Sequence, residues 1–178
     1  MISKMNKIFN YMVLLFFLVI ISGILFYKFD SSSQRSFFGY RFYTVLSNSM
    51  KKIKPEQQGN FVAGDMVIVK VTPPEDIMVG DIMTFYPKTK EENYVTHRVI
   101  KVIPPKTTGE SSHFMTQGDA NNLADAEISG EQVVGKVVFN IPKLGLVTTF
   151  VQINIVKMMI FVLFVWVAIV LLRYSVSK

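Results

Sequence analysis

The sequence predicts a mostly β fold, an antiparallel β-domain between two transmembrane helices. Two long apolar runs lie near the ends of the chain, at residues 8–27 and 155–172. Short β-rich runs separated by turn signals fill the interval, in which no amphipathic helix of about ten residues or more is predicted. At 178 residues the chain has room for one domain and its anchors, not for two sizeable cores.

The first apolar run, residues 8–27, carries no charge and has the length of a membrane span. Its residues, in a helix rising about 1.5 Å each, cover roughly 30 Å, the thickness of a hydrocarbon core. Lys4 and Lys7 precede the run, which predicts that residues 1–7 are cytoplasmic. A cleaved signal peptide is the alternative, but the length of the run and the bulky segment 27–29 favour a retained anchor.

The second apolar run, residues 155–172, is interrupted only by Lys157, whose side chain can extend to the membrane interface. Basic residues in the tail 173–178 predict that this end is also cytoplasmic. Residues 28–154 then form an extracytoplasmic domain. The sequence therefore predicts a two-pass protein of the cell membrane.

The positive charge of the chain belongs to the segments that flank these runs. The formal net charge is +6, yet residues 29–152 hold 13 Lys and Arg against 13 Asp and Glu. The excess cations are Lys4, Lys7, Lys28, Lys157, Arg173 and Lys178. This distribution suits contact with lipid headgroups and argues against a nucleic-acid partner. The chain has no cysteine, which excludes disulfides and cysteine-ligated metals.

The interval between the apolar runs is rich in strand signals. The β-rich runs are residues 66–71, 81–86, 94–103 and 132–139. Frequent Gly-Asp and Pro-containing turns separate them, which predicts an antiparallel barrel or folded sheet. Five aromatic residues at 37–43 are expected in the barrel core, although some could reach the lipid headgroups. The polar, lysine-rich segment 51–60 is expected to be a mobile surface loop.

Few residues in this domain can carry proton-transfer chemistry. His97 lies in the strand-like segment 96–100, where a histidine is more often structural. A neutral imidazole, with a pKa near about 6.5, could instead take the proton of a serine such as Ser49. His113 lies in a polar stretch and is expected at the surface. Two histidines this far apart do not predict a metal site.

A third segment, residues 117–122 followed by Asp125, is either a turn or a source of the carboxylate that would orient His97. Serine and aspartate are abundant, so a Ser/His/Asp set chosen from one chain has little weight by itself. The sequence thus leaves open a non-catalytic, membrane-anchored β-domain that serves as a scaffold or interaction module. In that alternative, Ser49 and His97 would be structural.

Four segments in order resemble the motif set of type I signal peptidases. They are Ser47-Asn48-Ser49-Met50 and residues 80–85, 96–100 and 117–121, and the resemblance covers roughly residues 40–140. The histidine at position 97 resembles the endoplasmic-reticulum-type branch of the family, also found in archaea and some Gram-positive bacteria. The usual bacterial branch has a lysine at that position. The resemblance implies a signal-peptidase-like β-fold.

This resemblance implies a role for each matching residue. Ser49 would be the nucleophile and His97 the general base, while the Ser49 N–H, with the Ser47 hydroxyl as a second candidate, would stabilise the oxyanion. Asp119 and Asp125 both match acidic positions, one of them orienting His97, and Asp125 is favoured because Asp119 lies in a Gly-Asp turn. Lys51 follows Met50 where family members commonly have an acidic residue or proline, a departure that concerns the loop after the nucleophile.

The activity implied by the resemblance is a serine endopeptidase that removes N-terminal signal peptides from exported pre-proteins after small residues. It would need neither cofactor nor metal. Its partners would be signal peptides, the lipid bilayer and the export machinery. A serine peptidase of similar fold that cleaves itself or a regulator is a third possibility, which the two predicted anchors disfavour.

Overall fold

The computed structural model describes residues 11, 13, 15, 36–87, 94–105, 107 and 109–176. The chain divides into two compact units, Met1–Arg35 and Ser36–Lys178. The predicted cytoplasmic segment 1–7 and the predicted helix 8–27 lie outside the described residues, except for helical residues 11, 13 and 15. The second unit contains all the described strands and the C-terminal helix.

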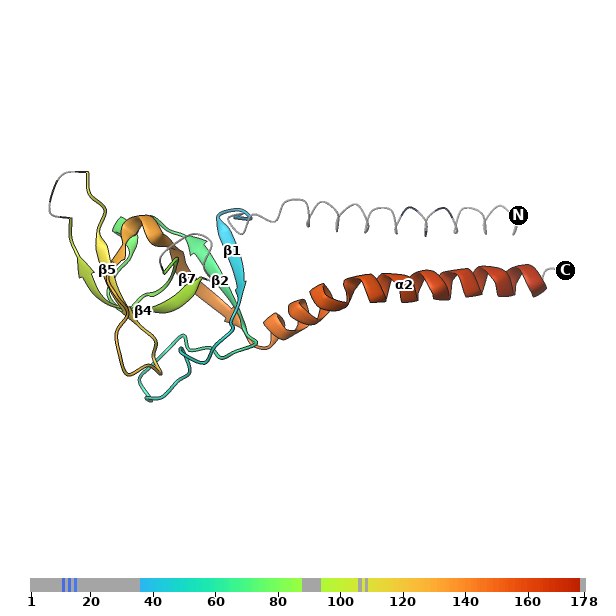
Figure 1. Cartoon of the computed structure of the whole chain (residues 1–178), viewed down its shortest axis with the longest axis horizontal. Helices are drawn as coiled ribbons and strands as arrows, with labels where there is room; N and C mark the ends of the chain where they lie inside the picture. The colour runs from blue at the N-terminus through green and yellow to red at the C-terminus, as the bar shows by residue number, and fades with distance from the viewer. Residues whose placement is uncertain are drawn as a thin grey trace. The chain divides into compact units, whose positions relative to one another are not determined.

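A single antiparallel sheet forms this unit, curved into a half-barrel (Figure 1). Its order is β1-β2-β7-β3-β4-β5-β6, and every neighbouring pair is antiparallel. The strands are β1 (Tyr40–Thr44), β2 (Met66–Val71), β3 (Ile82–Phe85), β4 (Val95–Ile103), β5 (His113–Gln117), β6 (Ile128–Ser129) and β7 (Val133–Ile141). Two 3-10 helices, η1 (Pro74–Asp76) and η2 (Gly130–Gln132), lie in the connections. The predicted antiparallel β fold is confirmed.

The four strands expected from β-rich runs are β2, β3, β4 and β7. The other three strands lack a long apolar or alternating signal. β5 begins at His113, directly after a polar stretch, and β6 has two residues, too few to show a period. The His113 side chain, at the start of this strand, contacts the Glu127 carboxylate. It is 40% exposed, which agrees with the surface position expected for it.

Two clusters of apolar side chains make the core, and β3 contributes to both. All four of its residues are buried. Ile82 belongs to the cluster that contains Met50 and Phe61, whereas Met83 belongs to the cluster that contains Phe114. Because successive side chains of a strand point to opposite faces, β3 is covered on both sides. The adjacent strand β4 is thereby paired with the strand at the middle of the sheet.

The aromatic residues around β1 differ from expectation. Phe37, Phe38 and Phe42 are 72%, 91% and 53% exposed, so the prediction that they belong to the core is wrong for them. β1 is an edge strand of the sheet, and its Tyr40 and Phe42 side chains lie on a face that is largely exposed. Tyr43 points the other way, packs against the first core cluster and stacks on Tyr94 at a centroid distance of 4.4 Å.

The C-terminal helix α2 (Leu144–Val176) begins well before residue 155, where the apolar run starts. Leu144–Leu172 is the one helix among the described residues that is long and apolar enough to cross a membrane, by length and composition alone. Its start is bonded to the β1–β2 connection, since Leu146 N–H donates to the Gly64 carbonyl at 3.0 Å. A Cβ on Gly145 would lie 2.5 Å from the Asp65 carbonyl oxygen, so glycine permits this close approach.

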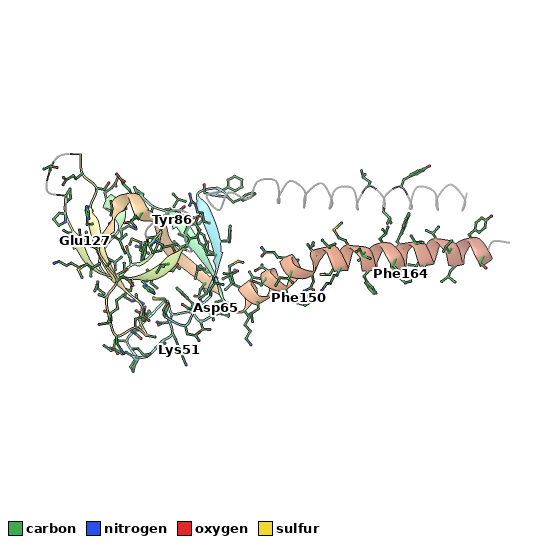
Figure 2. All side chains as sticks on the ribbon, viewed as in Figure 1. Lys51, Asp65, Tyr86, Glu127, Phe150 and Phe164 are labelled. Atoms are coloured by element: carbon green, nitrogen blue, oxygen red, sulfur yellow. The ribbon has the colours of Figure 1, made fainter. Side chains whose placement is uncertain are left out.

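Asp65 completes this junction (Figure 2). It is 6% exposed, and its carboxylate accepts the Lys143 N–H at 2.9 Å and the Val62 N–H at 3.0 Å. Its own carbonyl accepts the Val45 N–H at 2.9 Å. The first turn of α2 is therefore fixed to the chain that leaves β1.

Candidate active site

Ser49 lies in a tight connection after β1, and the backbone around it is held from several sides. The Ser49 carbonyl accepts the Ala120 N–H at 2.8 Å, and the Asn48 side-chain oxygen accepts the Ala63 N–H at 2.9 Å. Met50 is 1% exposed and belongs to the core. A half-buried serine is thus placed on a backbone that is anchored on both sides of it.

His97 extends from β4, opposite Met83 of β3, and is 7% exposed. Its Nε2 lies 3.0 Å from Ser49 Oγ, and its Nδ1 lies 2.6 Å from Asp125 Oδ2. An ionised carboxylate only accepts hydrogen bonds, so Nδ1–H donates to Asp125 and Nε2 can accept the Ser49 O–H. In this arrangement the His97 imidazole can accept the proton of Ser49, and the Asp125 carboxylate fixes the orientation of the ring.

Asp125 is held by β5 through Thr116. The Asp125 N–H donates to the Thr116 carbonyl at 2.8 Å, and the Thr116 hydroxyl donates to Asp125 Oδ2 at 2.6 Å. Thr116 is fully buried. Sequence reasoning did not identify Thr116, which precedes the 117–121 motif and has no distinguishing signal in its spacing.

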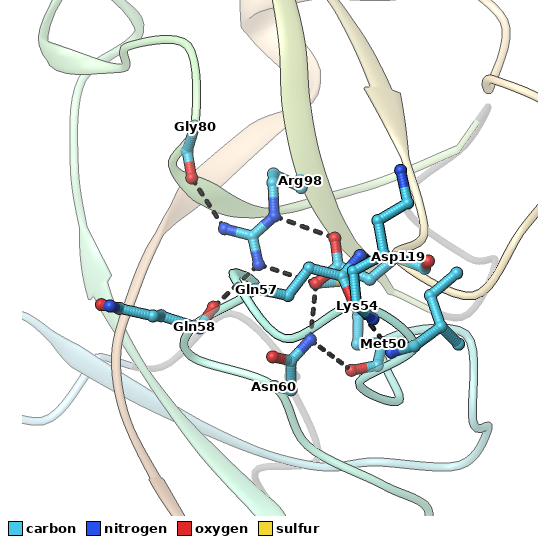
Figure 3. A network of polar contacts seen from close by, with 9 residues as sticks. Met50, Lys54, Gln57, Gln58, Asn60, Gly80, Arg98 and Asp119 are labelled. Atoms are coloured by element: carbon cyan, nitrogen blue, oxygen red, sulfur yellow. Dashed lines mark hydrogen bonds and ion pairs between the residues drawn. The ribbon is translucent and has the colours of Figure 1, made fainter.

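Asp119 belongs to a different network, shown in Figure 3. The Arg98 guanidinium donates to both of its carboxylate oxygens, at 2.8 and 2.7 Å. The Asn60 amide donates to Asp119 Oδ2 at 2.6 Å and to the Met50 carbonyl at 3.2 Å. Of the two candidate aspartates, Asp125 contacts His97, and Asp119 is linked to the backbone next to the serine.

Arg98 extends this network to two backbone carbonyls. It donates to Gly80 at 3.0 Å and to Gln58 at 2.8 Å. The hydrogen bonds that Arg98 donates to the Asp119 carboxylate raise the pKa of Arg98 above its ordinary value, which keeps the guanidinium charged. Residues 51–60 form the expected surface loop, and they are bonded to β4 through Gln58 and to the segment after β5 through Asn60. Neither contact could be deduced from spacing, because Asn60 and Asp119 are 59 positions apart.

Ser47 lies beside the nucleophile candidate. Its Oγ is 3.2 Å from Ser49 Oγ and 3.5 Å from the Ser49 backbone nitrogen. The Ser47 hydroxyl and the Ser49 N–H are therefore close enough together for both to approach one developing oxyanion.

A cavity of about 630 Å³ opens at Ser49 and His97. Its walls include the residues that follow β1, the start of β4, Asn121, and two residues of α2, Thr149 and Gln152. The volume is in the usual range of ligand-binding clefts. Among the residues that the structure describes, no three His, Asp or Glu side chains gather as a metal site.

No family model matches the chain. The chain is similar to Signal peptidase I W of Bacillus subtilis (strain 168), with 30% identity over 125 residues. The matched region is 69% of this chain and 60% of that relative, so the chain spans less than two thirds of the relative's length. This modest similarity supports the relationship to type I signal peptidases that the four motifs indicate.

Proposed function

We propose that the protein is a type I signal peptidase, a serine endopeptidase that removes N-terminal signal peptides from exported pre-proteins. The observation that carries the proposal is the hydrogen-bonded series Ser49–His97–Asp125, which lies at the edge of a cavity. Similarity to a signal peptidase I supports the same reaction class. A histidine at the position of the general base supports the endoplasmic-reticulum-type branch within this proposal.

In the first half of the reaction, Ser49 Oγ attacks the carbonyl carbon of the scissile peptide bond. His97 Nε2 accepts the serine proton as the new C–O bond forms, and Asp125 stabilises the resulting imidazolium. The carbonyl oxygen becomes an oxyanion that accepts hydrogen bonds from the Ser49 N–H and the Ser47 hydroxyl. His97 then gives its proton to the leaving amine, which releases the mature protein.

In the second half, His97 takes a proton from water, and the hydroxide equivalent attacks the acyl-enzyme ester. The second oxyanion collapses, the C–O bond to Ser49 breaks, and the proton returns to Ser49 Oγ. The signal peptide leaves with a free carboxylate. No cofactor takes part in either half. Asp119 supports the site through Arg98 and Asn60 and does not exchange protons with substrate.

The proposed topology has two membrane spans, at residues 8–27 and 155–172, with the catalytic domain 28–154 outside the cell membrane. Short tails at 1–7 and 173–178 are cytoplasmic. Signal peptides emerge from the same bilayer, which explains why the peptidase would be anchored there. The export machinery that delivers pre-proteins is the expected neighbour.

The test is cleavage of a pre-protein by the purified full-length chain in detergent. Ser49→Ala and His97→Ala are each expected to lower kcat by at least about 10³-fold. Ser112→Ala and His113→Ala are the matched controls, because these residues lie on or next to β5 and outside the Ser49–His97–Asp125 series. Cleavage that persists in both the Ser49→Ala and the His97→Ala variant would contradict the proposal.

The same assay separates the alternatives. A wild type that cleaves no pre-protein would favour the membrane-anchored scaffold. A wild type that cleaves only itself or a soluble regulator would favour the third possibility.

A further inference from the structure

A second, more apolar cavity along α2 adjoins the cavity at Ser49. This second cavity has a volume of about 490 Å³. Four lining residues are common to both, namely Thr44, Val45, Leu46 and Thr149. The end of β1 and Thr149 of α2 therefore border both cavities, along a path from the Ser49 hydroxyl to the side of the helix.

One face of α2 lines this path. Leu146, Thr149, Phe150 and Ile153 line the second cavity and follow the i, i+3, i+4, i+7 spacing that places side chains on one side of a helix. The three apolar members are 59%, 62% and 70% exposed, in the order of the chain. Figure 2 shows Phe150 on the first turns of the helix. An exposed apolar face of α2 thus lines the cavity next to the one at Ser49.

The start of α2, which carries this face, is fixed to the connection between β1 and β2. Leu146 packs so closely on Gly64 that a Cβ there would lie 2.8 Å from Leu146 Cγ, and Asp65 accepts the Lys143 N–H. Since Val45 lines both cavities and bonds to Gly64 and Asp65, the helix and the path cannot shift independently.

We propose that α2 forms one wall of the substrate groove, and that the apolar segment preceding the cleavage site of a pre-protein lies against Phe150 and Ile153. The inference rests on the proposed function and specifies how its substrate is held. The occupant follows from the adjacency of the two cavities. A peptide whose scissile bond lies at Ser49 and whose preceding residues run past Val45 and Thr149 reaches this face next. Thr149 and Gln152 are the residues of α2 that border the cleavage-site end.

The kinetic test compares two substrates in detergent, a pre-protein and a short peptide that contains only its cleavage site. The double variant Phe150→Ser/Ile153→Asn should raise KM about tenfold for the pre-protein, from lost apolar contact, and leave KM for the short peptide unchanged. Val147→Asn is the matched control, since Val147 is 56% exposed on the same turns and lines neither cavity. Thr149→Phe should slow cleavage of both substrates, whereas Val147→Phe should not.

The contact test uses the inactive Ser49→Ala full-length chain in lipid nanodiscs, with a photoreactive residue at position 153 or, as control, at 147. Cross-links from position 153 to the apolar segment of an added pre-protein would support the inference. Cross-links only to lipid, to residues 8–27 of the chain or to a second copy would overturn it. Equal KM values of the double variant and the control for the pre-protein would overturn the inference as well. In that case, cleavage by the wild type would still support the proposed function. A wild type that cuts neither substrate would overturn both.

Discussion

Two neighbouring residues of β4, His97 and Arg98, each hold an aspartate, and they do so on opposite faces of the strand. His97 pairs with Asp125 and points to the Ser49 hydroxyl. Arg98 pairs with Asp119, which reaches the Met50 carbonyl through Asn60. Because successive side chains of a strand point to opposite faces, the contact of His97 with Ser49 and the contact of Arg98 with Asp119 are kept apart.

Burial distinguishes the two pairs further. The Asp119 side chain is 4% exposed, whereas the Asp125 side chain is 26% exposed. A buried ion pair that loses one partner leaves an uncompensated charge, which costs folding free energy. A carboxylate that orients an imidazole affects mainly the barrier of the reaction. The same change, aspartate to asparagine, should therefore have different consequences at the two positions.

The largest effect is expected for Asp125→Asn. Asparagine can donate to Nδ1 and so favour the wrong imidazole tautomer, which should lower kcat about 10⁴-fold. The thermal midpoint should change little. Rates of pre-protein cleavage and a melting curve on the same preparation test this. A variant that retains normal kcat would show that Asp125 does not orient the base.

Asp119→Asn should act on stability. Removing the charge that faces Arg98 is expected to lower the free energy of unfolding by about 3 kcal/mol, the lower end of the range for breaking a buried ion pair. Denaturant unfolding measures it, with kcat determined on the folded fraction. Glu127→Gln, from the exposed pair with His113, is the control and should cost less than about 1 kcal/mol. A loss of kcat without a loss of stability would reverse the assignment of the two aspartates.

Ser47→Ala sharpens the catalytic side of the comparison. Loss of one oxyanion donor should lower kcat about 10²–10³-fold, with KM and stability nearly unchanged because Ser47 is exposed. Steady-state kinetics on a pre-protein measure the effect. An unchanged kcat would show that the Ser47 hydroxyl does not stabilise the oxyanion together with the Ser49 N–H.

The smallest rate effect is expected for Thr116→Val, which keeps the shape of the buried side chain and removes its hydrogen bond to Asp125. We expect kcat to fall about tenfold, the equivalent of one hydrogen bond to a charged group. Combining Thr116→Val with Asp125→Asn in a double-mutant cycle provides the check. Additive effects would mean that Thr116 does not act through Asp125.

The sequence predicts the strands whose β-branched residues form a continuous run, such as β2 and β7, because propensity and burial agree there. It also points to Ser49 and His97, which lie in separate motifs. It does not predict β1 as an exposed edge, since aromatic side chains in a short run suit either a core or an uncovered face. The contacts of Thr116 and Asn60 depend on how the chain folds back, and no local pattern encodes them.

The length of α2 has a consequence for where a substrate would be cut. Its candidate span of 29 residues measures roughly 44 Å at about 1.5 Å per residue, whereas a hydrocarbon core is about 30 Å thick. The excess of about 14 Å corresponds to roughly nine residues, which end near Gln152 when counted from Leu144. In the proposed topology this excess stands above the hydrocarbon. It would then act as a spacer that sets the height of Ser49 over the bilayer and, with it, the number of substrate residues between the membrane edge and the cleaved bond.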